Sequence, residues 1–208
     1  MRWSVVIPVK RLPLAKSRLY DGTRPREVHR ELALALALDT AAAALACPAV
    51  ARVVAVTDDP RAAASLVSLG AVVVPDQPDQ GLNPALAYGA SRAAALAPGD
   101  GVAVLSADLA ALRPDELGAA LAASTPHRRA FVADAAGTGT TLLAARPGVA
   151  LEPRYGGRSR AAHRASGAAE LAGDWPSLRR DVDTAEDLAA AARLGLGPAT
   201  AAALGRVP

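Results

Sequence analysis

Both lysines of the chain lie in one short segment near the N-terminus, beside other groups that could hold phosphate. Lys10 and Lys16 are accompanied by Ser17 and Arg18, and the segment follows a short run of β-branched residues. Cationic side chains and a hydroxyl on a loop can neutralise and orient phosphate oxygens. A Gly-rich Walker sequence is absent, so a solvated basic loop remains the alternative interpretation. The pattern makes these four residues a candidate phosphate site.

Acidic residues follow two later apolar runs. Asp108 comes after the run at 101–106, and a carboxylate at the end of a strand suits Mg²⁺, which also binds substrate phosphate and water. Asp181 and Asp183 would share one face of a strand, where two carboxylates repel unless a cation lies between them. The alternatives are a helix cap for Asp108 and, for Asp183 with Thr184, the end of a strand and the start of a helix.

Two segments rich in glycine and hydroxyl residues could form a seat for an anion. They are Gly-Thr-Thr at 139–141 and Tyr-Gly-Gly-Arg-Ser at 155–159. Glycine lets backbone N–H groups approach an anion closely, and a helix that begins near Ser159 would add its positive end. The same strings are also ordinary turn signals. We therefore expect a phosphate or carboxylate seat here, with a simple turn as the alternative.

Short aliphatic runs alternate with helical patterns along the chain. We expect strands at 5–7, 52–56, 72–74, 101–106, 130–134, 140–144 and 178–182. We expect helices that begin near residues 25, 60, 84, 114, 159 and 185, with Asn83 as the cap of the third. Thr184 and Asp187 resemble a capping box before the last of them, and we expect the Ala-rich tail after Gly195 to be peripheral. Helical crossovers imply parallel strands, whereas 130–144 reads as an antiparallel pair. The sequence predicts one α/β domain over 1–208, with a mixed, mostly parallel sheet flanked by helices.

In open α/β sheets ligands bind beyond the carboxyl ends of the strands, where all these candidate groups would lie. Basic, acidic and anion-seating groups together favour phosphoryl-type transfer, which depends on positioning and charge neutralisation. No catalytic triad or tuned cysteine is apparent. We interpret His29 and His127 as surface residues and His163 as structural, although it could line the site. Cys47 is the single cysteine, and we expect a buried thiol.

Composition narrows the class of protein. The net charge is +3, with scattered arginines and only 3% aromatic residues, which does not favour nucleic-acid binding. No apolar run approaches the roughly 20 residues of a membrane span, and the N-terminal run is too short for a signal peptide. A lone cysteine excludes a disulfide framework within the chain. We expect a cytoplasmic protein without a membrane or nucleic-acid partner; the sequence does not indicate its oligomeric state.

Seven strings that span most of the chain in order resemble one family, the CofC or FbiD guanylyltransferases of deazaflavin coenzyme F(420) biosynthesis. They are IPVK at 7–10, AKSRL at 15–19, GLN at 81–83, SADL at 106–109, GTT at 139–141, GGRS at 156–159 with His163, and DVDT at 181–184. The resemblance implies a GT-A-like nucleotidyltransferase fold similar to that of the molybdenum-cofactor guanylyltransferase MobA. It also implies transfer of GMP from GTP to a small phosphorylated three-carbon acid, with release of pyrophosphate.

The same resemblance implies roles for particular residues. Mg²⁺ would be held by three aspartates, Asp108, Asp181 and Asp183. The acid would be held by Thr140, Gly156 and Ser159. GTP would contact the N-terminal segment, through Lys10, Lys16, Ser17 and Arg18, and also Asn83. Catalytic roles would fall to Asp108, Lys16 and Arg18.

Several alternatives stay open on the sequence. The acceptor could be phosphoenolpyruvate or 2-phospho-L-lactate, and the Ala/Arg bias favours the first. Rival functions are another GT-A nucleotidyltransferase, using CTP or a sugar phosphate, and a non-catalytic nucleotide-binding protein. Two positions depart from the family pattern: Ala110 stands where proline is expected, and Tyr155 where phenylalanine is expected.

Overall fold

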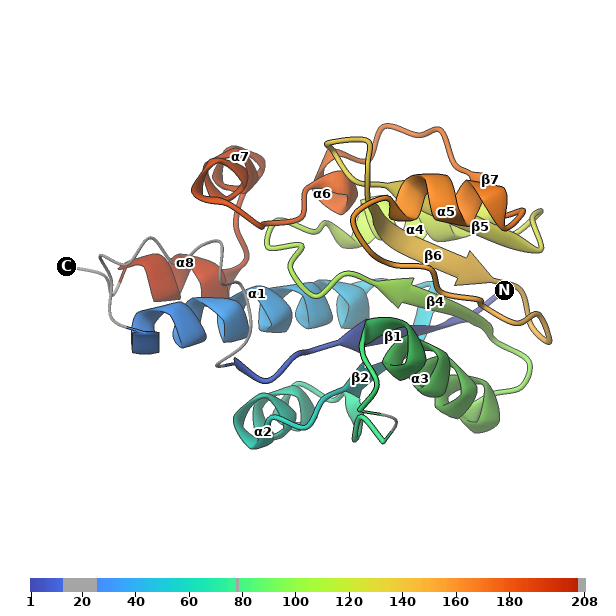
Figure 1. Cartoon of the computed structure of the whole chain (residues 1–208). Helices are drawn as coiled ribbons and strands as arrows, with labels where there is room; N and C mark the ends of the chain where they lie inside the picture. Colours follow the sequence, from blue (N-terminus) through green and yellow to red (C-terminus); the bar gives the residue numbers. More distant parts are fainter. Residues whose placement is uncertain (13–25, 78, 206–208) are drawn as a thin grey trace.

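A single seven-stranded sheet forms the centre of the molecule (Figure 1). The computed structural model describes residues 1–12, 26–77 and 79–205. The strands are β1 (Trp3–Pro8), β2 (Val50–Val56), β3 (Val72–Val74), β4 (Gly101–Leu105), β5 (Arg129–Ala133), β6 (Thr140–Ala145) and β7 (Ala169–Glu170). Their order across the sheet is β3-β2-β1-β4-β6-β5-β7.

The sheet is parallel in its first half and mixed in its second, as the sequence predicts. Strands β3, β2, β1 and β4 are all parallel, whereas β6 runs antiparallel to both β4 and β5. The carboxyl ends of β1 and β4 therefore lie side by side at one edge, and the start of β6 meets them there. This edge collects the polar residues that follow the strands.

Helices cover both faces of the sheet. They are α1 (Arg26–Ala46), α2 (Pro60–Ser68), α3 (Leu82–Leu96), α4 (Pro114–Ser124), α5 (Ser159–Ala165), α6 (Pro176–Arg179), α7 (Ala185–Leu194) and α8 (Pro198–Gly205). Alternate strand residues face opposite layers: Val5 packs with α1 and α4, whereas Val6 packs with α3. Helix α5 lies on the α3 face, where His163 contacts the Phe131 ring. No helix among the described residues has the length and apolar character needed to cross a membrane.

A glycine lets α3 approach the sheet. A Cβ at Gly89 would lie 2.6 Å from Val56 Cγ2 and 2.7 Å from Val6 Cγ1, closer than any normal carbon contact. The middle of α3 therefore lies at a distance from the sheet that only glycine permits.

Two local expectations are wrong. No strand forms over 178–182: α6 begins at Pro176, and the apolar residues Leu178 and Val182 are buried against different clusters. Burial, rather than β pairing, explains their apolar character. Helix α3 begins at Leu82 with Gly81 as its N-cap, because the Asn83 side chain bonds the backbone of Tyr155 and does not cap the helix.

The C-terminal segment packs more closely than the sequence indicates. We expected the residues after Gly195 to be peripheral, yet α8 lies against α1. The Asp39 carboxylate accepts hydrogen bonds from the backbone N–H groups of Ala199 at 2.9 Å and Thr200 at 2.7 Å. A buried carboxylate on α1 thus satisfies the first turn of α8.

Candidate functional site

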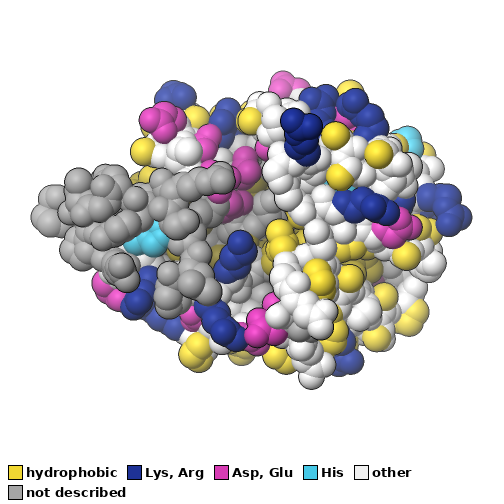
Figure 2. All heavy atoms as spheres, in the orientation of Figure 1, with side chains coloured by type: hydrophobic (Ala, Val, Ile, Leu, Met, Phe, Trp, Pro, Cys, Tyr) yellow, Lys and Arg dark blue, Asp and Glu magenta, His cyan; other side chains and the backbone are white. Residues whose placement is uncertain are grey.

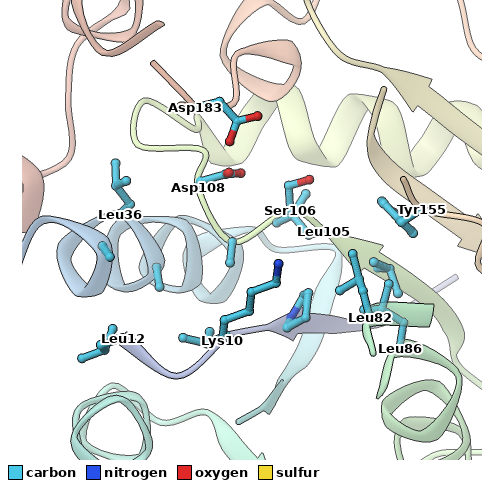
Figure 3. Close-up of a pocket in the computed structure, with 16 residues that line it drawn as sticks. Lys10, Leu12, Leu36, Leu82, Leu86, Leu105, Ser106, Asp108, Tyr155 and Asp183 are labelled. Atoms are coloured by element: carbon cyan, nitrogen blue, oxygen red, sulfur yellow. The ribbon is translucent and has the colours of Figure 1, made fainter. Parts of the chain in front are cut away.

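A cavity of about 400 Å³ opens at the carboxyl ends of β1 and β4. Its polar lining comes from four separate parts of the chain: Lys10, Ser106, Asp108, Tyr155 and Asp183 (Figure 3). Leu36 of α1 and Leu82 and Leu86 of α3 supply apolar walls. Figure 2 shows a hollow on this face in which basic and acidic side chains lie close together. Opposite charges and apolar walls in one cavity suit an anionic organic ligand.

Lys10 extends into this cavity from the end of β1. Pro8 ends the strand, and Val9 still donates a backbone hydrogen bond to Val56 at 2.9 Å, which fixes the chain just before Lys10. The side chain points toward Ser106 and Asp108 (Figure 3). Three further candidates from the same segment, Lys16, Ser17 and Arg18, lie outside the described residues.

Asp108 is held at the rim by backbone contacts on both sides. The next residue, Leu109, donates its N–H to Thr40 Oγ1 at 2.9 Å, and Val182 donates its N–H to the Asp108 carbonyl at 3.1 Å. The cap of α4 is Arg113, so Asp108 does not cap that helix. Its carboxylate faces the cavity instead.

Asp183 reaches the same cavity from the start of α7. Thr184 is the N-cap of that helix and forms a capping box with Asp187. The Asp187 carboxylate also accepts the N–H of Asp183 at 3.3 Å. The capping box predicted from the sequence is thus confirmed, and it leaves the side chain of Asp183 facing Asp108 across the cavity (Figure 3).

Asp181 shares an environment with other carboxylates. Burial, together with the nearby charges of Asp108, Asp134 and Asp183, raises its pKa to about 7. Such an accumulation of negative charge is unfavourable without a cation. Sequence reasoning missed Asp134, which lies in the turn before β6 and accepts the N–H groups of Thr138 and Gly139 at 2.9 and 2.8 Å.

The donor set at this rim fits a hard divalent cation. Mg²⁺ in nucleotide enzymes is commonly bound by one or two carboxylates together with phosphate oxygens and water. Asp108 and Asp183 face one cavity and could supply those two carboxylates. The oxygens of Asp108, Asp181 and Asp183 do not all lie within 4.8 Å of one another in the described structure. A single ion held by all three would therefore require side-chain rotation.

The expected anion seat is assembled around His163. Thr140 starts β6, and its hydroxyl lies 2.9 Å from His163 Nδ1. Ser159 starts α5, one helical turn before His163, and is 3% exposed. The turn leading to Ser159 passes through Gly156, whose φ of 150° favours glycine. The structure therefore brings Thr140 and the 156–159 turn to one buried histidine.

Asn83, which we expected to contact the nucleotide, is bonded instead to the backbone of Tyr155. Its side-chain amide donates to the carbonyl of Tyr155 at 3.0 Å and accepts from the Tyr155 N–H at 2.7 Å. Both polar ends of Asn83 are thereby occupied. The residue links the start of α3 to the turn that carries Gly156 and Ser159.

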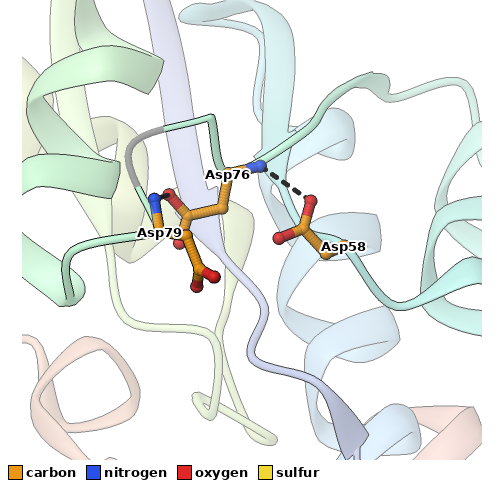
Figure 4. Close-up of side chains that lie close together, drawn as sticks. All are labelled: Asp58, Asp76 and Asp79. Atoms are coloured by element: carbon orange, nitrogen blue, oxygen red, sulfur yellow. Dashed lines mark hydrogen bonds between the residues drawn. The ribbon is translucent and has the colours of Figure 1, made fainter.

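A second cavity of about 260 Å³ adjoins the first and shares Lys10 in its wall. Three aspartates border it with oxygens within 4.8 Å of one another: Asp58, Asp76 and Asp79 (Figure 4). Asp58 accepts the N–H of Asp76 at 3.0 Å and pairs with Arg11 at 3.4 Å. Asp76 accepts the N–H of Asp79 at 3.3 Å. These partners order the loop and account for two of the three carboxylates without an ion.

Ser106 and Tyr155 line the cavity, but sequence reasoning noted them only as members of longer strings and gave neither a role in the site. It treated His163 as mainly structural. The position of Ser106 at the end of a buried strand was an available signal. Nothing in the sequence indicated that Asn83 and Tyr155 would meet, because their contact depends on the packing of α3 against a distant turn.

The comparisons with known proteins agree with this geometry. The model of the family "Guanylyl transferase CofC like" matches residues 3–197. The chain belongs to the CofC-like guanylyl transferases. As a member of this family it is a nucleotidyltransferase, and the match covers the rim residues Lys10, Asp108 and Asp183.

Relatives of this CofC-like chain carry one name. Phosphoenolpyruvate guanylyltransferase of Salinispora arenicola is 61% identical over 201 residues, which cover 96% of this chain and 92% of the relative. The protein of the same name from Streptomyces coelicolor is 57% identical over 212 residues, which cover 100% and 98%.

Solved structures of lower identity share the fold of the CofC-like chain. A nucleotidyl transferase from Methanothermobacter thermautotroptrophicus has a TM-score of 0.59 at 19% identity, covering 93% of this chain and 97% of that one. 4-diphosphocytidyl-2C-methyl-D-erythritol synthase from Anaerococcus prevotii has a TM-score of 0.60 at 12% identity, covering 93% and 96%. The predicted nucleotidyltransferase fold is confirmed.

Proposed function

We propose that this CofC-like protein transfers the guanylyl group of GTP to phosphoenolpyruvate and releases pyrophosphate. The observation that carries the proposal is the convergence of Lys10, Asp108 and Asp183 on one cavity beside a buried hydroxyl seat, in a chain of this family. The names of its relatives support phosphoenolpyruvate as the acceptor. A role in deazaflavin coenzyme F(420) biosynthesis stays a prediction from the resemblance.

In this reaction a phosphate oxygen of the acid attacks the α-phosphorus of GTP. The new P–O bond forms as the bond to the β-phosphate oxygen breaks, and the electron pair leaves with pyrophosphate. The attacking oxygen is already anionic at neutral pH, so the site needs no strong general base. This matches a rim whose described polar groups are a lysine, carboxylates and hydroxyls.

The main task of the protein is then to hold two anions close together. Lys10 lies in the wall of both cavities and can neutralise phosphate oxygens at their junction. We assign the nucleoside to the second cavity and the acid to the side of Thr140, Gly156 and Ser159. Asp108 and Asp183 would hold Mg²⁺, with Asp181 beside them. When bound, this ion supplies positive charge that reduces the repulsion between the two phosphates.

A substrate panel tests the proposal. The protein is incubated with Mg²⁺ and each combination of GTP, CTP or ATP with phosphoenolpyruvate, 2-phospho-L-lactate or a sugar phosphate, and pyrophosphate release is followed. We expect the fastest turnover with GTP and phosphoenolpyruvate. Equal turnover with CTP or with sugar phosphates would reject the assignment in favour of another nucleotidyltransferase.

The Asp108→Asn variant separates catalysis from simple nucleotide binding. Removal of this carboxylate should lower kcat by at least about 10²-fold, as for loss of a principal charge-stabilising group. The matched control is Asp115→Asn, because Asp115 is exposed, forms an ion pair with Arg113 and is not part of the cavity lining. A non-catalytic nucleotide-binding protein would show no turnover in either variant or in the wild type.

A further inference from the structure

His163 is fully buried and lies at the centre of the acid seat. It projects from α5 between two aromatic rings, with ring centroids 5.8 Å from Phe131 and 5.1 Å from Tyr155. Its Nδ1 lies 2.9 Å from Thr140 Oγ1, and its Nε2 accepts the backbone N–H of Arg154 at 2.9 Å. Both ring nitrogens therefore have defined partners.

These partners determine the tautomer of the ring. A backbone N–H can only donate, so Nε2 of His163 must be the unprotonated nitrogen that accepts from Arg154. A neutral imidazole then carries its hydrogen on Nδ1, which donates to Thr140 Oγ1. The ring stays neutral because burial, with the charges of Arg129 and Arg154, lowers the pKa of His163 to about 4.

The tautomer in turn constrains the hydroxyl of Thr140. Because Oγ1 accepts a hydrogen bond from His163, the hydrogen of the hydroxyl must point in another direction. Thr140 Oγ1 makes no other hydrogen bond with the part of the chain that the structure describes. The buried hydroxyl is thus left with a donor to offer, at a position where an anionic substrate would provide acceptors.

His163 also fixes the turn that completes the seat. Its bond to the Arg154 N–H and the two bonds of Asn83 to Tyr155 hold adjacent residues of the chain. Gly156 and Ser159 follow within the next four residues. One imidazole therefore contacts both halves of the seat, β6 through Thr140 and the turn through Arg154.

We propose that His163 is a positioning residue for the acid substrate, which directs the Thr140 hydroxyl to donate its hydrogen to the acid. The inference rests on the proposed function, because the proposed function identifies the acid as the anion that Thr140 would bind. His163 does not contact the reacting atoms and acts through Thr140. Its removal should therefore impair binding of the acid more than turnover of the bound substrates.

Nitrogen NMR of the ¹⁵N-labelled full chain tests the tautomer without any substrate. For His163 we expect a protonated Nδ1 and an unprotonated Nε2 at pH 7. The His163→Gln variant identifies the signals by their loss. A protonated Nε2 would overturn the inference, whatever the activity of the protein.

A double-mutant cycle tests the functional part, with wild type, His163→Gln, Thr140→Val and the double variant. The glutamine can still accept from Arg154, but it has no donor at the position of Nδ1. Each single variant should raise the KM for phosphoenolpyruvate about 10-fold or more, as for loss of a hydrogen bond to a charged group, with the KM for GTP changed less than about twofold. In the Thr140→Val background the His163 change should add little, because its effect passes through that hydroxyl.

Two further variants sharpen the result. The His163→Asn variant places an amide donor near the position of Nδ1 and should restore much of the affinity for the acid. The control variant His127→Ala, in the loop between α4 and β5, should match wild type. The proposal would be overturned if the effects of His163→Gln and Thr140→Val on the KM were additive, or if glutamine rather than asparagine at position 163 preserved the affinity for the acid. Either result would mean that His163 only anchors the turn. If folded wild type does not turn over GTP with phosphoenolpyruvate, the proposed function is contradicted instead. The NMR experiment still tests the tautomer of His163 in that case, because it needs no substrate.

Discussion

Tyr155 shows how differently the backbone and the side chain of one residue can be satisfied. Its backbone N–H and carbonyl are both bound by Asn83. Its phenol hydroxyl is buried and has no hydrogen-bond partner among the described residues. Burial accordingly raises the pKa of the phenol well above its ordinary value. The family resemblance leads us to expect phenylalanine here, and the hydroxyl is therefore an extra polar group at a position where an apolar ring is expected.

Replacement of this tyrosine should therefore not destabilise the protein. We expect Tyr155→Phe to keep or raise the free energy of unfolding, by up to about 1 kcal/mol, since it removes a buried polar atom without leaving a partner unsatisfied. Urea denaturation of both proteins measures the difference. A loss of stability, or a rise in the KM for phosphoenolpyruvate, would mean that the hydroxyl has a partner in the folded or liganded protein.

At the scale of elements, the distance between α3 and the sheet governs the cavity wall. Leu82 and Leu86 of α3 line the cavity, and Asn83 of the same helix holds the Tyr155 turn. At Gly89 this helix lies so close to β1 and β2 that an added Cβ would overlap Val6 and Val56. A side chain there would push the helix outward and disturb both the cavity wall and the Tyr155 turn.

Two glycine substitutions in helices should consequently have opposite effects. Gly89→Ala should destabilise the protein by about 1–3 kcal/mol, because its Cβ would overlap Val56 and Val6. Gly118→Ala in α4 is the matched control: its Cβ would lie 3.5 Å from Cys47 Sγ, an ordinary contact. That change should stabilise the helix by about 0.5–1 kcal/mol. Thermal unfolding of the two variants compares them, and similar effects of both would contradict the close approach of α3.

The pH dependence of stability is a property of the whole molecule to which His163 makes a defined contribution. Its pKa is lowered from 6.5 to about 4 in the folded protein, first by burial and then by Arg129 and Arg154. Between these values the unfolded chain binds a proton that the folded protein does not. The stability associated with neutral His163 is therefore present above pH 6.5 and is lost as the pH falls toward 4.

The His163→Gln variant isolates this contribution, because every other titrating group is shared with wild type. The difference in unfolding free energy between the two proteins should shift by about 3 kcal/mol against wild type as the pH falls from 7 to 4. Denaturation at several pH values in the presence of a chelator measures it. A difference that does not change with pH would contradict a buried, neutral histidine.

The chain itself determined much of the fold through local spacing. Aliphatic runs separated by helical patterns predicted the parallel half of the sheet, and Thr184 with Asp187 predicted the cap of α7, since these signals act within a few residues. Asp108 could be identified as a site residue because it follows a buried strand at the edge where ligands bind. The strand expected over 178–182 was wrong, because an apolar pattern reports burial and not the partner that causes it.

Only the tertiary structure decided which of these residues meet. The bond from the Val182 N–H to the Asp108 carbonyl brings Asp183 to the cavity, and Asn83 reaches Tyr155 across 72 positions of the chain. His163 became part of the proposed acid seat through its contacts to Thr140 and Arg154, which its neighbours in the sequence do not identify as ring partners. Such contacts depend on how helices pack on the sheet. Local propensity carries no information about that packing, because it is fixed by the combined burial of many distant side chains.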